Sequence, residues 1–167
     1  MTRMRRTGLL ATLLLVAAGP LAARETIGVW RSWGAFRDRD RCYAIASPAS
    51  AGGASRWRPF ASVARWTETS SGRGLRASLH VRLSRERDRS APVTLTVGER
   101  RFALVGNGVD AFATDAASDR AIVAALRGAR SMSIETVGVR GRPFADSYAL
   151  RGAATAIDAA ILACAGR

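Results

Sequence analysis

Apolar and polar residues alternate along much of this chain with a period of two. The clearest run is 75–83, in which every second residue is Leu, Ala or Val and the residues between are Arg, Ser or His. Because successive side chains of a β-strand point to opposite faces, this run predicts a strand with one apolar and one polar face. His80 falls on the polar face of that strand.

A tight β-hairpin is predicted shortly after this strand. Two alternating runs, 93–97 and 100–105, are separated only by Gly98-Glu99. Glycine in the first place of a two-residue loop favours a type II′ turn, whose twist suits paired strands. The implied register places Leu95 opposite Phe102 and Val93 opposite Leu104, so the turn and the apolar pattern agree.

Five further runs have the composition of strands, and two segments have the period of helices. The strand segments are 29–36, 41–47, 58–67, 131–138 and 144–150. An internal helix is expected to begin at a cap formed by Asp115 or Ser118 and to end at Gly128. A second helix is expected over 153–164, with Ile157, Ile161 and Cys164 on one face.

These elements together predict the fold class. Residues 24–167 are enough for one domain with a single core, and no linker or internal repeat divides them. Short strands at regular spacing are typical of a sandwich. The chain is therefore predicted to be mainly β: a single β-sandwich with immunoglobulin-like layers, one short internal helix and a C-terminal helix.

The first 23 residues have the pattern of a secretory signal peptide. Arg3, Arg5 and Arg6 precede an apolar run, and Ala22-Ala23 provide small residues for cleavage. Gly19-Pro20 interrupts the run short of the roughly 20 residues that a transmembrane helix needs. We therefore expect cleavage after Ala23, no integral membrane span in the mature chain, and a location in the periplasm or cell envelope.

Cys42 and Cys164 are the only cysteines. An oxidising compartment would allow them to pair, and the helical spacing of 153–164 turns Cys164 toward the core. The alternative, a reactive thiol pair, would need a close C-x-x-C arrangement or neighbouring positive charge to lower the thiol pKa, and nothing in the spacing suggests such a pair. We predict a structural disulfide between Cys42 and Cys164.

The chain is strongly basic. Its 26 basic residues are all Arg, and its formal net charge of +13 becomes +10 without residues 1–23. A coding bias toward GC-rich codons explains the missing Lys as well as a functional choice does. The charge nevertheless permits an anionic polymer as a partner.

Two arginine-rich segments and the tryptophans are the candidate ligand contacts. Arginine alternates with Asp or Glu at 37–41 and 85–89, which indicates either solvated loops or rims that hold phosphate or sulfate. Arg56-Trp57-Arg58 places arginine beside an aromatic ring, as glycan and nucleic-acid sites do, although core packing explains tryptophan equally. The candidate contacts are Trp30, Trp33, Trp57, Arg37, Arg39, Arg85, Arg87 and Arg89.

No catalytic or metal-binding set is evident in the sequence. His80 is the only histidine and is expected to be a solvated surface residue, since a triad needs a carboxylate and a nucleophile beside it. The segment 106–111 matches a dinucleotide-binding pattern but follows a hairpin strand, so we interpret it as a turn. We expect no metal, no cofactor and no enzymatic activity.

Several short motifs occur in a characteristic order. They are Trp33-Gly-Ala-Phe36, Arg41-Cys-Tyr-Ala-Ile-Ala46, the 93–105 hairpin, Asp110-Ala-Phe112, Ile122-Val-Ala-Ala-Leu126, Arg140-Gly141, Asp146-Ser-Tyr-Ala-Leu150 and the segment ending in Cys164. This order resembles the invasion-associated locus B family of exported bacterial proteins. The resemblance implies a periplasmic or envelope-associated β-sandwich with no established catalytic mechanism.

Three functions remain open from the sequence. The first is a non-catalytic module that binds an envelope protein or a surface polymer. The second is a binder of polyanions such as lipopolysaccharide phosphates or extracellular nucleic acid. The third is a periplasmic hydrolase whose Ser or Asp residues come together only on folding.

Overall fold

The computed structural model describes residues 24–53, 56–67 and 76–165, and the predicted signal peptide lies outside these ranges. The strands are β1 (Glu25–Trp30), β2 (Trp33–Arg37), β3 (Arg41–Ala46), β4 (Phe60–Trp66), β5 (Ala77–Arg82), β6 (Val93–Val97), β7 (Arg100–Asn107), β8 (Asp110–Ala113), β9 (Ser131–Val137) and β10 (Pro143–Ala149). The helices are α1 (Ala116–Gly128) and α2 (Ala153–Ala163). The expected mainly β class, with one internal and one C-terminal helix, is confirmed.

All ten strands belong to one antiparallel sheet in the order β1-β2-β3-β4-β5-β8-β7-β6-β9-β10. Strands that are neighbours in the sheet are also consecutive in the chain, except for the pairs β5–β8 and β6–β9. Because hydrogen bonds join every strand to this one sheet, the two separate sheets of a sandwich are not confirmed.

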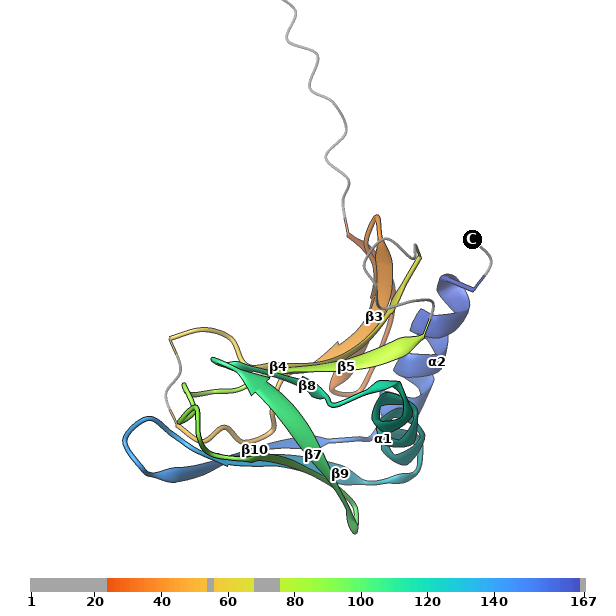
Figure 1. Cartoon of the computed structure of the whole chain (residues 1–167). Helices are drawn as coiled ribbons and strands as arrows, with labels where there is room; N and C mark the ends of the chain where they lie inside the picture. The colour runs from red at the N-terminus through yellow and green to blue at the C-terminus, as the bar shows by residue number, and fades with distance from the viewer. Residues whose placement is uncertain (1–23, 54–55, 68–75, 166–167) are drawn as a thin grey trace, which may run out of the picture.

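The sheet curls so that its two halves face each other across the core. Figure 1 shows β4, β5 and β8 running above β7, β9 and β10, with both helices on one side. The segment after β3 reaches across to the last strand, where Ala49 N–H donates to Ser147 O at 2.7 Å and Ser50 forms a bridge with Ser147. Apolar side chains from both halves and both helices form one core.

The predicted 93–105 hairpin is confirmed in its register. Leu95 pairs with Phe102 and Val93 pairs with Leu104. Gly98 has a φ of +58°, a conformation that the first central residue of a primed turn requires and that glycine adopts without steric cost.

The predicted strand 29–36 is instead a hairpin of two strands, β1 and β2. Arg31 has a φ of +59° at the turn, and Trp30 pairs with Trp33 across it. The two tryptophans therefore do not face opposite sides of one strand: Trp33 is fully buried, and Trp30 packs partly buried against the core. The turn carries no glycine, so no local signal in the sequence marked it.

The helices begin and end close to their expected positions. Asp115 is the N-cap of α1, and its carboxylate accepts hydrogen bonds from the N–H groups of Ala117 and Ser118. The first N–H groups of a helix have no acceptor within the helix, so the cap supplies one. α2 follows Gly152, whose φ is +92° and where a Cβ would lie 2.1 Å from Trp30 O. α2 packs on β1 to β4 and α1 packs mainly on β5.

The predicted disulfide is confirmed. Cys42 on the inner side of β3 is bonded to Cys164 at the end of α2, with a Cα–Cα distance of 5.9 Å. Both residues are buried. The bond therefore fixes the helix against the first half of the sheet.

Candidate functional site

The candidate site lies at the end of the sheet where three connections meet. These are the segment before β4, the segment after β5 and the β9–β10 turn. Trp57 Nε1 donates to Leu83 O at 2.6 Å, which fixes the segment before β4 against the end of β5. The three connections are thus held together by hydrogen bonds within the site itself.

A buried carboxylate supports the site from beneath. Asp146 on β10 is 0% exposed and accepts from Ser84 N–H at 2.7 Å, Ser84 Oγ at 2.5 Å and Gly52 N–H at 2.8 Å. A buried charge is tolerated only when such donors satisfy it. Asp146 therefore ties the segments after β3 and β5 to the last strand.

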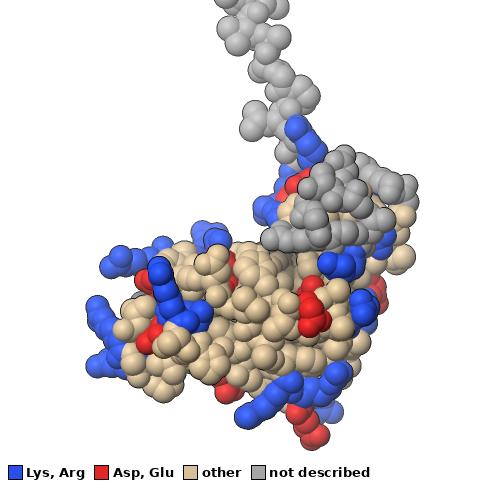
Figure 2. All heavy atoms as spheres, in the orientation of Figure 1, with Lys and Arg blue, Asp and Glu red and all other residues tan. Residues whose placement is uncertain are grey.

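Above this support lies a hollow of about 530 Å³ with four arginines among its nine described lining residues. Its lining residues are Arg56, Trp57, Ser84, Arg85, Glu86, Gly138, Val139, Arg140 and Arg142. Among the described residues, none of the four arginines forms an ion pair with a carboxylate. In Figure 2 the blue arginine spheres gather at this end of the molecule, at the left of the view.

Arg85 is positioned by its surroundings. Its guanidinium lies 5.9 Å from the centre of the Phe144 ring, and a Cβ on Gly53 would lie 2.1 Å from Arg85 Nη2. Gly53 thus leaves the space that Arg85 fills. Stacking on a ring restrains the guanidinium while leaving N–H groups for an acceptor.

Two of the predicted ligand contacts, Trp57 and Arg85, line this hollow. Arg87 does not. It is 8% exposed, and its guanidinium donates to main-chain carbonyls of Asp88, Ala91, Arg89 and Gly106 at 2.6–3.2 Å. Arg87 organises its own loop, and we remove it from the candidate site.

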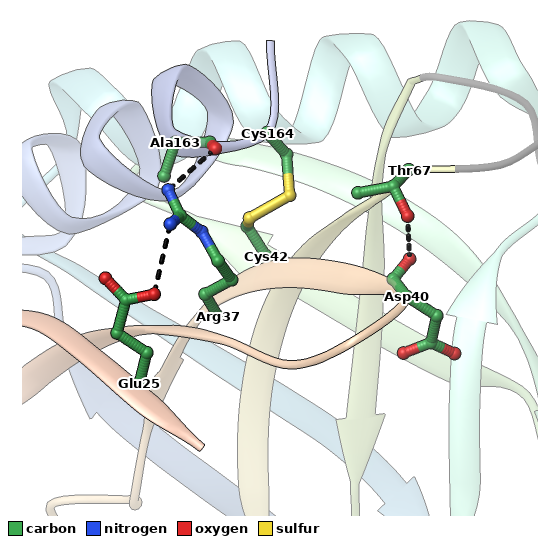
Figure 3. The surroundings of a disulfide bond; sticks show 7 residues. All are labelled: Glu25, Arg37, Asp40, Cys42, Thr67, Ala163 and Cys164. Carbon is green, nitrogen blue, oxygen red and sulfur yellow. Dashed lines mark hydrogen bonds and ion pairs between the residues drawn. A yellow bond between two sulfur atoms is a disulfide. The ribbon is translucent and has the colours of Figure 1, made fainter. Parts of the chain in front are cut away.

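Trp33 and Arg37 also serve the fold. Trp33 Nε1 donates to Ala149 O at 2.9 Å from a fully buried position. Figure 3 shows Arg37 beside the disulfide, with Nη2 donating to Ala163 O at 2.9 Å and Nη1 paired with Glu25 Oε2 at 3.0 Å. Neither side chain lines the arginine hollow.

The other predicted contacts lie apart from the hollow. Trp30 packs against the core, while Arg39 and Arg89 are exposed in turns and do not line it. The alternating charges at 37–41 and 85–89 therefore do not form one rim.

Three arginines of the hollow were not among the predicted contacts: Arg56, Arg140 and Arg142. Arg56 flanks Trp57 in the sequence, which was the one signal that could have identified it. Arg140 and Arg142 lie in a turn 54 or more residues beyond Arg85, and only the pairing of β9 with β10 brings that turn to the site.

His80 is not the plain solvated residue that was expected. Its Nε2 lies 2.7 Å from Asp110 Oδ1, and its ring stacks on Phe112 with centroids 4.7 Å apart. Ser62 is its cross-strand neighbour, but the Ser62 hydroxyl donates to the His80 main-chain oxygen at 3.4 Å. That hydroxyl is not aligned with the ring as a nucleophile is aligned with its base.

The described residues contain neither a cluster of metal ligands nor a helix that could span a membrane. Within ranges 24–53, 56–67 and 76–165, no three His, Cys, Asp or Glu side chains gather as metal ligands. In the same part of the chain, neither helix has the length and apolar character to cross a membrane.

Comparisons with models of protein families, with curated proteins and with solved structures find no match to this chain.

Proposed function

We propose that this protein is a non-catalytic binding module of the cell envelope that holds the phosphate or sulfate groups of an anionic surface polymer. The observation that carries the proposal is the hollow with four arginines that have no carboxylate partner among the described residues. Guanidinium groups bind such anions through paired N–H donors, with stronger hydrogen bonds than neutral groups make.

The charge balance of the hollow supports an anionic ligand. Among the described residues that line it, Glu86 is the only acidic one, against Arg56, Arg85, Arg140 and Arg142. Four like charges at one place repel each other unless counter-ions or a ligand offset them. An anion that contacts several of these arginines therefore binds more tightly than an anion that contacts a single arginine.

Export supports a polymer of the envelope as the ligand. The pattern of residues 1–23 and the resemblance to the invasion-associated locus B family favour this location, and a disulfide that closes 122 residues of chain is typical of oxidising compartments. The geometry favours a polyanion over a protein partner because the lining is charged and the arginines are spread over three connections.

The test is fluorescence anisotropy with labelled linear polyphosphate and oxidised protein of residues 24–167. We expect saturable binding that weakens steeply with added salt, because bound arginines release counter-ions from the polymer. The variant Arg140→Ala/Arg142→Ala should bind about tenfold more weakly, since two charge-assisted contacts are lost.

The matched control is Arg101→Ala/Arg130→Ala, which removes the same charge at the opposite end of the sheet, where both residues are exposed. It should retain affinity within about twofold. Equal loss in both variants would mean that net charge alone attracts the polymer, and that result or the absence of binding would overturn the proposed site.

A further inference from the structure

A second hollow, of about 650 Å³, lies on the outer face of the first half of the sheet. Its floor is formed by small side chains on adjacent strands: Ser62 and Ala64 on β4 and Ser78 on β5. Ala64 pairs directly with Ser78, and Ser62 lies two residues along. Small residues at the centre of a sheet face leave a depression that larger side chains would fill.

Aromatic rings close the depression at both ends. At one end Phe60 lies edge-on to His80, with centroids 5.0 Å apart, and Phe112 stacks on the other side of His80. At the other end are Tyr43 and Trp66. The space between two ring clusters suits a compact, flat, apolar body and not an extended chain.

Arginines lie over these rings at both ends. Arg82 lies 5.4 Å from the centre of the Phe60 ring, and Arg41 lies 5.1 Å from Tyr43 and 5.2 Å from Trp66. A guanidinium stacked on a ring keeps its N–H groups in a restricted plane, which lowers the entropy lost on binding an anion.

The acidic residues beside this hollow offset its arginines only in part. Among the described residues, four arginines and one aspartate line it, and the aspartate, Asp119, accepts from the Leu79 N–H at 2.8 Å. Asp38 pairs with Arg24 and Arg41 at 3.5 Å, and Asp110 is shared by His80 and Arg82 at 2.7 and 3.1 Å. Four arginines therefore face three carboxylates, and the lining combines an apolar interior with a rim that carries an excess of one positive charge.

We propose that this hollow is a second binding site, separate from the arginine hollow at the loop end, for a small amphipathic anion. Its ligand has a flat aromatic or alicyclic ring body that lies over Ser62, Ala64 and Ser78. A carboxylate, sulfonate or phosphate on that body is held by Arg41 or Arg82. This site is independent of the polymer binding proposed above.

The test is isothermal titration calorimetry with naphthalene-2-sulfonate and with its neutral counterpart, naphthalene-2-sulfonamide. We expect saturable binding of the sulfonate at one molecule per protein and at least about tenfold weaker binding of the sulfonamide, which lacks the charge for Arg41 or Arg82. Absence of saturable binding, or equal binding of the two compounds, would overturn the proposal.

Variants locate the binding. Ser78→Leu fills the floor and should weaken sulfonate binding about tenfold or more, whereas Ser133→Leu on the distant β9 should not. Arg41→Gln/Arg82→Gln leaves the floor intact and should also weaken sulfonate binding, with Arg101→Gln/Arg130→Gln as its control. If Ser78→Leu does not melt cooperatively, this double variant decides: affinity equal to that of the unsubstituted protein contradicts the site.

The loop-end variant Arg140→Ala/Arg142→Ala separates the two proposals. It should lose polyphosphate binding and keep naphthalene-2-sulfonate binding unchanged. Loss of sulfonate binding in that variant would place the sulfonate in the loop-end hollow and overturn a second site, whereas failure of polyphosphate binding alone leaves this inference standing.

Discussion

Arg87 holds its guanidinium among four main-chain carbonyls. Those carbonyls come from its own loop and from Gly106 on β7, so one side chain links two segments that do not pair as strands. Arg85, two residues earlier, lines the loop-end hollow instead. Residues with the same chemistry in the same alternating run therefore take opposite roles.

Gly106→Ala tests the structural role of Arg87. An alanine Cβ would lie 2.2 Å from Arg87 Nε, which displaces the guanidinium from its carbonyl acceptors. We expect a loss of about 1–3 kcal/mol in the free energy of unfolding, measured with urea. Gly128→Ala at the end of α1 is the control, because no atom lies within 4 Å of the added methyl group, and its change should stay within about 1 kcal/mol. Equal effects of the two changes would refute this role.

Asp119 shows the cost of burial at a single residue. Burial raises the pKa of its carboxyl, and the Leu79 N–H and the Arg76 charge oppose that rise less strongly. The folded protein therefore takes up this proton at a higher pH than the unfolded chain does. The stability that follows is fully present below the ordinary Asp pKa and is lost as the pH rises through the raised value.

Asp119→Asn keeps an acceptor oxygen for Leu79 and removes the titration. The free energy of unfolding of the unsubstituted protein, minus that of the variant, should fall as the pH rises from acid to neutral. Urea unfolding across this pH range measures the difference. Asp88, whose carboxyl pKa is lowered chiefly by hydrogen bonds from Ser90, is present in both proteins and cancels. The Asp115 charge is the smallest cause of the raised pKa of Asp119, and it acts in the same direction as burial. A flat or rising difference would contradict the assignment.

At the scale of elements, alternation and turn chemistry predicted best where both were present. Gly98 marked the β6–β7 turn, and Leu95 and Phe102 then fixed the register. The β1–β2 turn has Arg31 in the left-handed region and no glycine, so nothing in the run 29–36 marked a turn between two strands. The short strand β8 was missed, because its four residues follow the turn at Gly108 and are too few to show a period.

The disulfide sets how firmly α2 is held. α2 contacts β1 to β4, and its far end is fixed by the bond to Cys42 and by Arg37 on Ala163 O. In Cys42→Ala/Cys164→Ala we expect a loss of about 3–5 kcal/mol in the free energy of unfolding. Alanine is preferred because a serine hydroxyl would be buried at either position.

Hydrogen exchange localises this loss. Amides of α2 should exchange faster in the variant than in the unsubstituted protein. The increase should be larger for α2 than for β6 and β9, because without the bond α2 can unfold locally while the sheet stays folded. Arg127→Ala, which removes the exposed pair between α1 and Asp158, is the control and should change α2 exchange little. Uniform acceleration across the sheet would show that the bond stabilises only the whole fold.

At the scale of the whole molecule, the sequence predicted the mainly β fold class but not how the sheet curls and closes on itself. Nothing in the pattern of single strands indicated that β5 would pair with β8, or that one sheet would curl until Ser50 meets Ser147. Both hollows depend on these long-range contacts. Arg140 reaches Arg85 only through the β9–β10 turn, and Phe112 reaches His80 only through the β5–β8 junction. The local period of apolar residues carries no information about contacts between residues that are far apart in the sequence.

The placement of Cys164 also dictates the timing of oxidation. A chain is synthesised from its amino end, so Cys42 on the third strand appears 122 residues ahead of its partner. Cys164 follows all ten described strands, and the crosslink can close only after every one of them is available to pair. The crosslink therefore contributes nothing to strand pairing that takes place before Cys164 has been synthesised. An oxidant that reaches the nascent chain early finds one thiol, which it can couple only to a thiol of another molecule.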